Sequence, residues 1–181
     1  MKITFLGTAA GKPSKYRNVT SIALELENND YILIDCGEAT QHQIIKSKLK
    51  FTKLHSIYIT HLHGDHIFGL PGLLASLNEY RTDELNIFGP VGLLQYINFI
   101  KSGPYCNISN YEINVIEIPD IYNTINYINY KSNTYKVECC YVEHCVQCYS
   151  YVITKSNTQP KIDIDKLQPI LDKYANEIIN L

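Results

Sequence analysis

One segment constrains the fold of this chain more than any other: a strand-like run that passes directly into a cluster of histidines. Residues 54–59 (LHSIYI) are largely apolar, and the sequence THLHGDH follows at once. Because side chains alternate along a strand, His61 and His63 are expected to face the same side at the strand end. A tight turn at the glycine then brings Asp65 and His66 into nearby space. The sequence therefore predicts a strand that ends in a cluster of polar donors and is followed by a helix.

This cluster is typical of a metal site. Imidazole nitrogens and carboxylate oxygens are the usual ligands of Zn²⁺ in catalytic sites. Such a zinc keeps one position open for water and lowers the pKa of that water toward about 7. Two neighbouring metals can hold both the attacking and the leaving oxygen of a phosphodiester. The alternative, surface histidines in a polar loop, fits a lone histidine much better than this dense pattern.

The order of the remaining elements predicts a mixed α/β layered domain, with strands first, then alternating strands and helices, then strands again. Strands are expected at residues 2–6, 20–27, 31–34, 54–59, 85–88, 111–118, 135–142 and 148–154. Helices are expected at residues 39–49, 68–80 and 91–101. Pro71 is tolerable only in the first turn of its helix. Residues 123–133 indicate a loop or a weak hairpin, and the C-terminal tail has helical spacing interrupted by Pro169.

Length and composition limit the classes of function. The 181 residues suit one domain, and 45% hydrophobic with 19% charged residues is typical of a globular chain. The net charge of −2 argues against a protein that coats RNA, but it leaves room for a local basic patch. We find no signal peptide and no apolar run of about 18 residues. We therefore expect a cytoplasmic protein with reduced cysteines and no membrane association.

In its motifs the chain resembles ribonuclease Z, a group within the metallo-β-lactamase superfamily. Residues 61–66 (HLHGDH) are similar to the superfamily signature HxHxDH. Three further stretches resemble segments of ribonuclease Z: FLGTAAGKPSKYRNVTS, LIDCGEATQHQI and VEHCVQCYSYVI. The resemblance covers residues 1–155 and implies the N-terminal part of a metallo-β-lactamase-like domain, about half of an αββα sandwich. Residues 156–181 would then be a short helical tail or a truncated arm.

The resemblance implies a zinc-dependent endoribonuclease that removes the 3′ trailer from precursor tRNA. It implies one zinc held by three histidines and a second held by two further residues: His61, His63 and His144 for the first, Asp65 and His66 for the second. It also implies that Asp65 is the catalytic proton acceptor.

Two further sets of residues have possible roles beside this site. Asp35 could hold the second ring nitrogen of a metal-binding histidine, although a simple turn residue at a strand end is an equal alternative. Lys12, Lys15 and Arg17 share one loop, which the resemblance places beside the active site, where they could contact RNA phosphates. A solvated basic loop is the alternative.

The chain departs from the ribonuclease Z pattern after His144. The second half of those enzymes supplies an aspartate that bridges both metals and a last histidine. Residues 145–181 contain Asp163, Asp165 and Asp172 but no histidine. We therefore expect an incomplete second metal site, with a homodimer or a complementing C-terminal half as partner. The alternatives are a catalytically incomplete fragment that acts as a binding or partner protein, and a hydrolase of a small phosphodiester with the same fold.

The cysteines allow two interpretations. Cys139, Cys140, Cys145 and Cys148 surround His144, and the last two form a CxxC pair. A structural zinc or a redox pair is one interpretation, but a single CxxC is a weak signal. Because a free cysteine often behaves as a small buried hydrophobe, we predict that these cysteines, like Cys36, serve packing.

Overall fold

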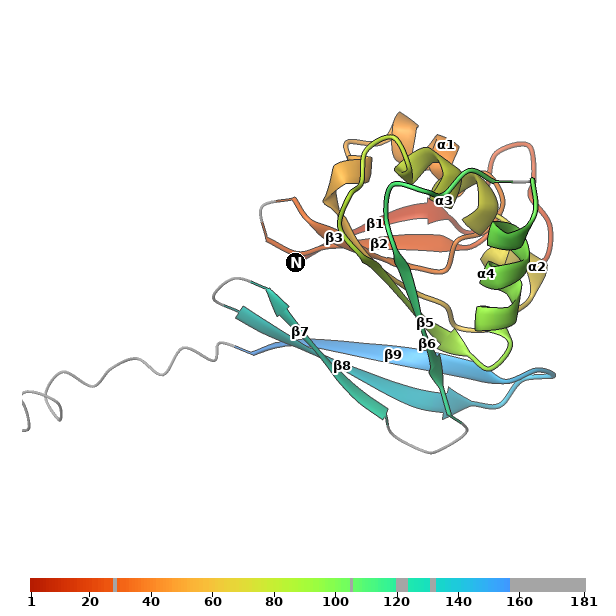
Figure 1. Cartoon of the computed structure of the whole chain (residues 1–181). Coiled ribbons are helices and arrows are strands. Elements are labelled where there is room, and N and C mark those ends of the chain that lie inside the picture. The colour runs from red at the N-terminus through yellow and green to blue at the C-terminus, as the bar shows by residue number, and fades with distance from the viewer. Residues whose placement is uncertain (28, 105, 120–123, 131–132, 157–181) are drawn as a thin grey trace, which may run out of the picture. The chain divides into compact units, whose positions relative to one another are not determined.

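The computed structural model describes residues 1–27, 29–104, 106–119, 124–130 and 133–156 (Figure 1). It divides into two compact units, one of Met1–Ile125 with Glu138–Val152 and one of Asn126–Val137 with Ile153–Leu181. The predicted tail or arm falls outside the described residues from residue 157 onward, and so do Asp163, Asp165 and Asp172. Within the described ranges, no helix is long and apolar enough to cross a membrane.

A six-stranded sheet is the framework of the first unit. Its strands follow one another in sequence order: β1 (Lys2–Gly7), β2 (Ser21–Glu25), β3 (Tyr31–Ile34), β4 (Leu54–Tyr58), β5 (Leu85–Pro90) and β6 (Ile113–Ile118). The first three strands pair antiparallel, whereas β3 to β6 pair in parallel. Parallel neighbours need crossover connections, and helices occupy the connections between β3 and β6. Strands and helices alternate along this part of the sequence, as predicted, and this is why strands β3 to β6 of the sheet are parallel.

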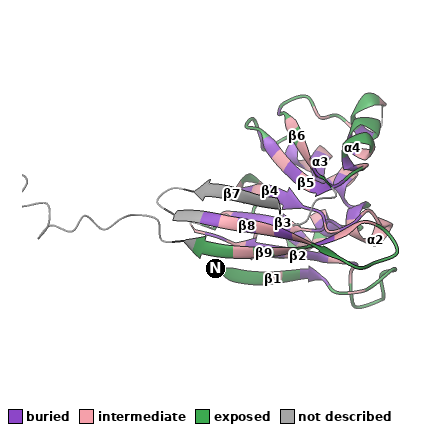
Figure 2. Cartoon of the chain, turned by 90° about the horizontal axis from the view of Figure 1, so that it is seen from below, coloured by how far each residue is buried: buried purple, intermediate pink, exposed green. Residues whose placement is uncertain are grey.

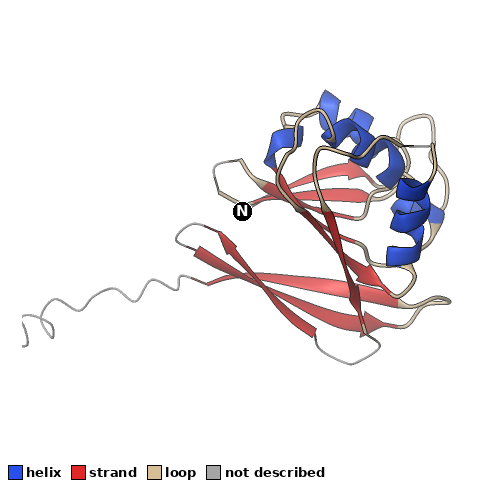
Figure 3. Cartoon of the chain, in the orientation of Figure 1, coloured by secondary structure: helices blue, strands red, loops and turns tan. Residues whose placement is uncertain are grey.

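The helices lie on one side of this sheet (Figure 3). They are α1 (Thr40–Lys46), the short 3-10 helix η1 (Phe51–Lys53), α2 (Gly64–Ile67), α3 (Leu70–Leu77) and α4 (Leu93–Ser102). The helix predicted at residues 68–80 is shorter in the structure, from Leu70 to Leu77, and the short helix α2 before it was not predicted. Pro71 does lie in the first turn of α3, where its missing amide costs nothing.

Buried apolar residues of the strands and helices fill the core of the first unit. On α3 the inward residues Leu70, Leu73, Leu74 and Leu77 are each 0% exposed. Cys36 is also fully buried, so its predicted packing role is confirmed. By contrast, β1 is an edge strand, and Figure 2 shows much of it exposed. Burial therefore concentrates around β3 and β4, the strands whose ends lead into the site.

A second sheet contains three strands in the order β7-β8-β9. These are β7 (Thr124–Tyr130), β8 (Asn133–Val142) and β9 (Cys148–Ser156). Of the two alternatives for residues 123–133, the hairpin is confirmed, because β7 is a full strand beside β8. Residues of this sheet belong to both units, and those from Glu138 to Val152 belong to the first. The loop between β8 and β9, which carries His144, is therefore part of the same unit as the histidine cluster.

Candidate metal centre

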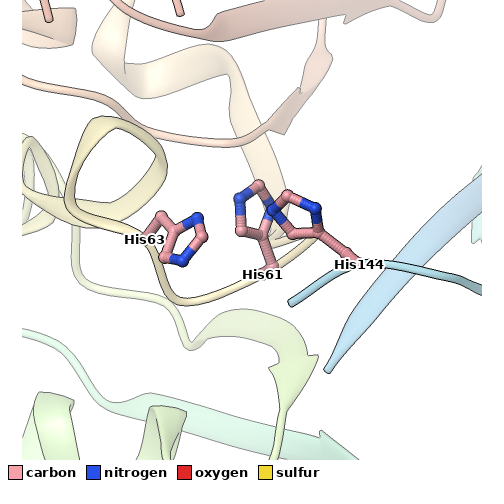
Figure 4. Close-up of side chains that lie close together, drawn as sticks. All are labelled: His61, His63 and His144. Carbon is pink, nitrogen blue, oxygen red and sulfur yellow. The ribbon is translucent and has the colours of Figure 1, made fainter. Parts of the chain in front are cut away.

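Three of the predicted metal ligands come together in space. His61 and His63 lie between β4 and α2, and His144 lies in the loop between β8 and β9. One donor atom from each of these histidines lies within 4.8 Å of the other two. Figure 4 shows the three rings converging on one space from two separate stretches of chain. The first predicted ligand group is thus assembled by the fold, although its members are some eighty positions apart in sequence.

Hydrogen bonds hold the two contributing segments together. The backbone amide of Tyr149 in β9 donates to the carbonyl oxygen of Thr60 at 2.9 Å. The hydroxyl of Tyr151 donates to the carbonyl oxygen of Ile59 at 2.6 Å. Both acceptors follow β4 directly, immediately before the first histidine. Because β9 is fixed at this point, the loop that precedes it places His144 opposite the end of β4.

Asp35 is buried at the end of β3 and connects two of the histidines. Its Oδ2 accepts a hydrogen bond from Nδ1 of His66 at 2.7 Å, and its Oδ1 accepts one from the Thr60 amide at 2.8 Å. Since an ionised carboxylate can only accept, Nδ1 of His66 carries the proton. The lone pair of that ring is therefore at Nε2, the nitrogen left for a metal.

Thr60 extends the same network to His61. Its hydroxyl oxygen is 2.9 Å from Asp35 Oδ2 and 3.0 Å from Nδ1 of His61. The hydroxyl has one proton, which the carboxylate attracts, so it accepts from the His61 ring. Nε2 of His61 is then also left with a free lone pair. Asp35 and Thr60 together select the tautomer of two histidines, which is what a metal site requires of the groups behind its ligands.

The electrostatics of His61 and Asp65 agree with this arrangement, whereas the raised pKa of His66 favours its protonated ring and so opposes metal binding there. Burial, with the nearby His66, lowers the pKa of His61 to about 4, so this ring is neutral at pH 7. Burial acts to lower the pKa of His66, but the hydrogen bond and charge of Asp35 outweigh it and raise that pKa. For Asp65, burial acts to raise the pKa, but the Gly11 amide and His66 lower it overall. A neutral imidazole and an ionised carboxylate are the forms that bind metals.

The tight turn predicted at Gly64 is instead the start of α2, and Asp65 and His66 follow it in the same helix. Asp65 Oδ2 accepts a hydrogen bond from the Gly11 amide at 2.6 Å and is 3.5 Å from Nε2 of His66. These two residues form the second predicted ligand group. The bond to Gly11 fixes the N-terminal loop against the site, where the resemblance placed it.

A pocket of about 550 Å³ opens beside Asp65 and His63. Lys12 lines it, together with the exposed ring of Phe68. Lys15 and Arg17 line a different hollow, of about 440 Å³. The structure therefore divides the predicted basic group, since only Lys12 shares the pocket with the site. Sequence reasoning missed Phe68, because an aromatic residue ahead of an apolar helix looks like a core residue.

The cysteines follow the packing prediction only in part. Cys139 is 2% exposed, as expected for a core position on β8. Cys145 is exposed, so the packing interpretation is wrong for this residue. It lies in the loop between β8 and β9, where the alternation of a strand does not apply.

Comparison with known proteins identifies the family. A family model described as "Anti-Pycsar protein Apyc1" matches residues 1–178. The chain belongs to this family. It is also 41% identical over 172 residues to the protein named ribonuclease Z of Prochlorococcus marinus (strain MIT 9301), covering 94% of this chain and 54% of that protein. It is 42% identical over 171 residues to ribonuclease BN of Proteus mirabilis (strain HI4320), covering 93% and 54%. The chain thus spans about half the length of these curated relatives.

Solved structures agree with the sequence comparison. The short form of human tRNase Z superposes with a TM-score of 0.73 at 32% identity, covering 86% of this chain and 65% of that one. The metallo-β-lactamase fold protein YhfI of Bacillus subtilis gives a TM-score of 0.62 at 19% identity, covering 84% and 58%, and supports the fold alone. The resemblance to ribonuclease Z and the mixed α/β metallo-β-lactamase fold are therefore confirmed.

Proposed function

We propose that this chain carries the metal-binding part of a ribonuclease Z-like, zinc-dependent endoribonuclease that removes the 3′ trailer from precursor tRNA. The observation that carries the proposal is the convergence of His61, His63 and His144 within 4.8 Å in a chain whose relatives are named ribonuclease Z. We propose that the chain acts in an assembly, with a complementing C-terminal half or a second copy as partner.

The donor set supports zinc as the metal. Three imidazoles match the ligands found in catalytic zinc sites, and the low pKa of His61 keeps its ring neutral near pH 7. We assign the first site to His61, His63 and His144, and we assign Asp65 and His66 to a second. When bound, zinc supplies Lewis acidity and makes a water more acidic.

The chain's own residues prepare the site for hydrolysis. Asp35 and Thr60 hold the rings of His61 and His66 in the tautomer that leaves Nε2 free. Asp65 has a lowered pKa, so it is ionised near neutral pH and can accept a proton from water in the adjoining pocket. Its bond to the Gly11 amide fixes the carboxylate at the pocket wall.

The basic loop supports an RNA substrate. Lys12 reaches the pocket of the site, while Lys15 and Arg17 extend positive charge along the same loop. Replacing all three by alanine should weaken tRNA binding and reduce the salt dependence by about one unit of slope for each lost phosphate contact. A matched variant that replaces the exposed Lys48, Lys50 and Lys101 removes the same charge elsewhere. Equal effects in both variants, or none in the first, would show that the loop does not contact RNA.

Cleavage of precursor tRNA tests the function itself. The full chain is assayed with added Zn²⁺ or Mn²⁺, alone and with a separately expressed C-terminal half of a ribonuclease Z relative. We expect cleavage after the mature 3′ end in the assembly, and its loss in His63→Ala and Asp65→Ala. Cleavage that both variants retain would refute the assignment of the site.

Hydrolysis of a small phosphodiester is the second candidate. The family model that matches the chain is described as an anti-Pycsar protein and not as a nuclease. A chromogenic substrate such as bis(para-nitrophenyl) phosphate separates the two candidates. Turnover of this compound by the chain, with no cleavage of precursor tRNA by any assembly, would favour the second.

A further inference from the structure

Cys145 lies directly against two of the clustered histidines. Its sulfur is 3.8 Å from Nε2 of His63 and 3.9 Å from Nε2 of His144. The residue is exposed in the loop between β8 and β9, so core packing does not account for its position. A thiol proton can be donated to only one nitrogen at a time, whereas the sulfur is almost equally far from both. The thiol could donate to one ring and accept from the other, and the same position also suits a metal ion that both nitrogens and the sulfur bind.

The distances from the sulfur to His63 and His144 are close to those between two ligands of a single zinc ion. Bonds of about 2.0–2.1 Å to nitrogen and about 2.3 Å to sulfur, at the tetrahedral angle, separate the two ligand atoms by about 3.6 Å. The two observed distances exceed this value by only a few tenths of an ångström. Small rotations of the exposed side chain would close that difference.

We propose that the thiolate of Cys145 is a fourth protein ligand of the metal held by His61, His63 and His144. The inference rests on the metal centre assigned under the proposed function. On binding, the S–H bond breaks, a sulfur–metal bond forms and the proton passes to solvent. Three histidines and one cysteine make a closed set of four, so the thiolate occupies the position that a catalytic site keeps open for water. The metal is then held more tightly, and hydrolysis requires the sulfur to leave.

Cobalt substitution tests the ligand directly. Co²⁺ is titrated into the metal-free full chain, and we expect a sulfur-to-cobalt charge-transfer band in the near ultraviolet. Cys145→Ser should abolish the band and weaken Zn²⁺ binding, measured against a competing chelator, by at least tenfold, since loss of even an outer hydrogen-bond partner costs about 10–100-fold. Cys148→Ser is the matched control, because it removes a thiol three positions away and should leave the band and the affinity unchanged.

The outcomes separate this inference from the metal centre itself. If the wild-type chain binds Co²⁺ without the band, or if Cys145→Ser keeps it, the thiolate is not a ligand while the histidine site stands. If neither protein binds metal, both the inference and the proposed centre are wrong. Thermal unfolding of the metal-free variants shows that each is folded, which the exposure of Cys145 leads us to expect.

Discussion

Replacing Asp35 by asparagine tests the hydrogen-bond network behind the histidines. The Asp35 carboxylate is 2% exposed and accepts from His66 and from the amide of Thr60. Asparagine has nearly the same shape, and it tolerates the positive φ of 58° at this position. The two side chains differ because one carboxylate oxygen becomes an NH₂ group, which donates and does not accept.

The structure sets the size of the effect. In Asp35→Asn the remaining oxygen can keep the Thr60 amide, and the NH₂ group then faces Nδ1 of His66. That ring can accept only by moving its proton to Nε2, which removes the lone pair that a metal needs. The affinity of the second site, formed by Asp65 and His66, for a metal should therefore fall by about 10–100-fold. Loss of one hydrogen bond to a charged group should lower the free energy of unfolding by about 1.5–3 kcal/mol. Since each kcal/mol corresponds to about 2–4 °C in a chain of this size, the Tm of the metal-free chain should fall by about 3–12 °C.

Two comparisons complete this experiment. Asp35→Ala leaves both the Thr60 amide and Nδ1 of His66 without the acceptor, so its Tm should fall further than that of Asp35→Asn. Asp30→Asn makes the same chemical change in the ion pair with Lys53, where a cost of at most about 1 kcal/mol is expected. Metal affinity is measured by competition with a chelator and Tm by calorimetry. Unchanged metal affinity in Asp35→Asn would refute the tautomer argument, whatever happens to stability.

Three further changes follow from particular contacts. Tyr151→Phe removes the hydroxyl that donates at 2.6 Å to the carbonyl oxygen of Ile59, just after β4. It should lower the free energy of unfolding in urea by about 1 kcal/mol, and an unchanged unfolding midpoint would show that this hydrogen bond does not stabilise the fold. Gly69→Ala would place a methyl group against the carbonyl oxygen of Gly37, so the backbone must shift, at a cost of about 1–3 kcal/mol in the same assay. In the metal-free chain, iodoacetamide should label the exposed Cys145 before Cys36, because Cys36 is buried and burial raises its thiol pKa. Mass spectrometry of the labelled peptides measures the order, and labelling of Cys36 first would contradict this expectation.

Sequence patterns predicted the strands well, because alternation of apolar and polar residues is a local property. The short helix α2 was not predicted and the start of α3 was placed two residues too early, for a reason that is not local. The amide of Gly69, at the start of α3, donates to the carbonyl oxygen of Cys36, far away in sequence. That tertiary hydrogen bond separates α2 from α3, and neither helix periodicity nor capping residues announce it. The boundary was therefore outside what a single-sequence pattern can show.

The candidate site was predictable to different extents. The spacing of His61 and His63 places both on one side of a strand end, so that pair could be inferred from the residues alone. His144 required the resemblance to ribonuclease Z, because nothing in its own neighbourhood links it to the other two. The hydroxyl of Thr60 had no sequence signal, and Cys145 had only the weak signal of a single CxxC pair, since both roles depend on distances that the fold creates.

Hydrogen bonds within the protein help to place the histidine cluster. The hydrogen bonds of Tyr149 and Tyr151 hold the two chain segments together, and Asp35 with Thr60 orients the rings. Three imidazoles this close would repel one another if they were all protonated, and the low pKa of His61 removes that cost near neutral pH. Small metal-dependent domains instead gain their folding free energy from the ion. In this chain these hydrogen bonds contribute to the geometry of the three rings alongside any free energy that a metal would supply.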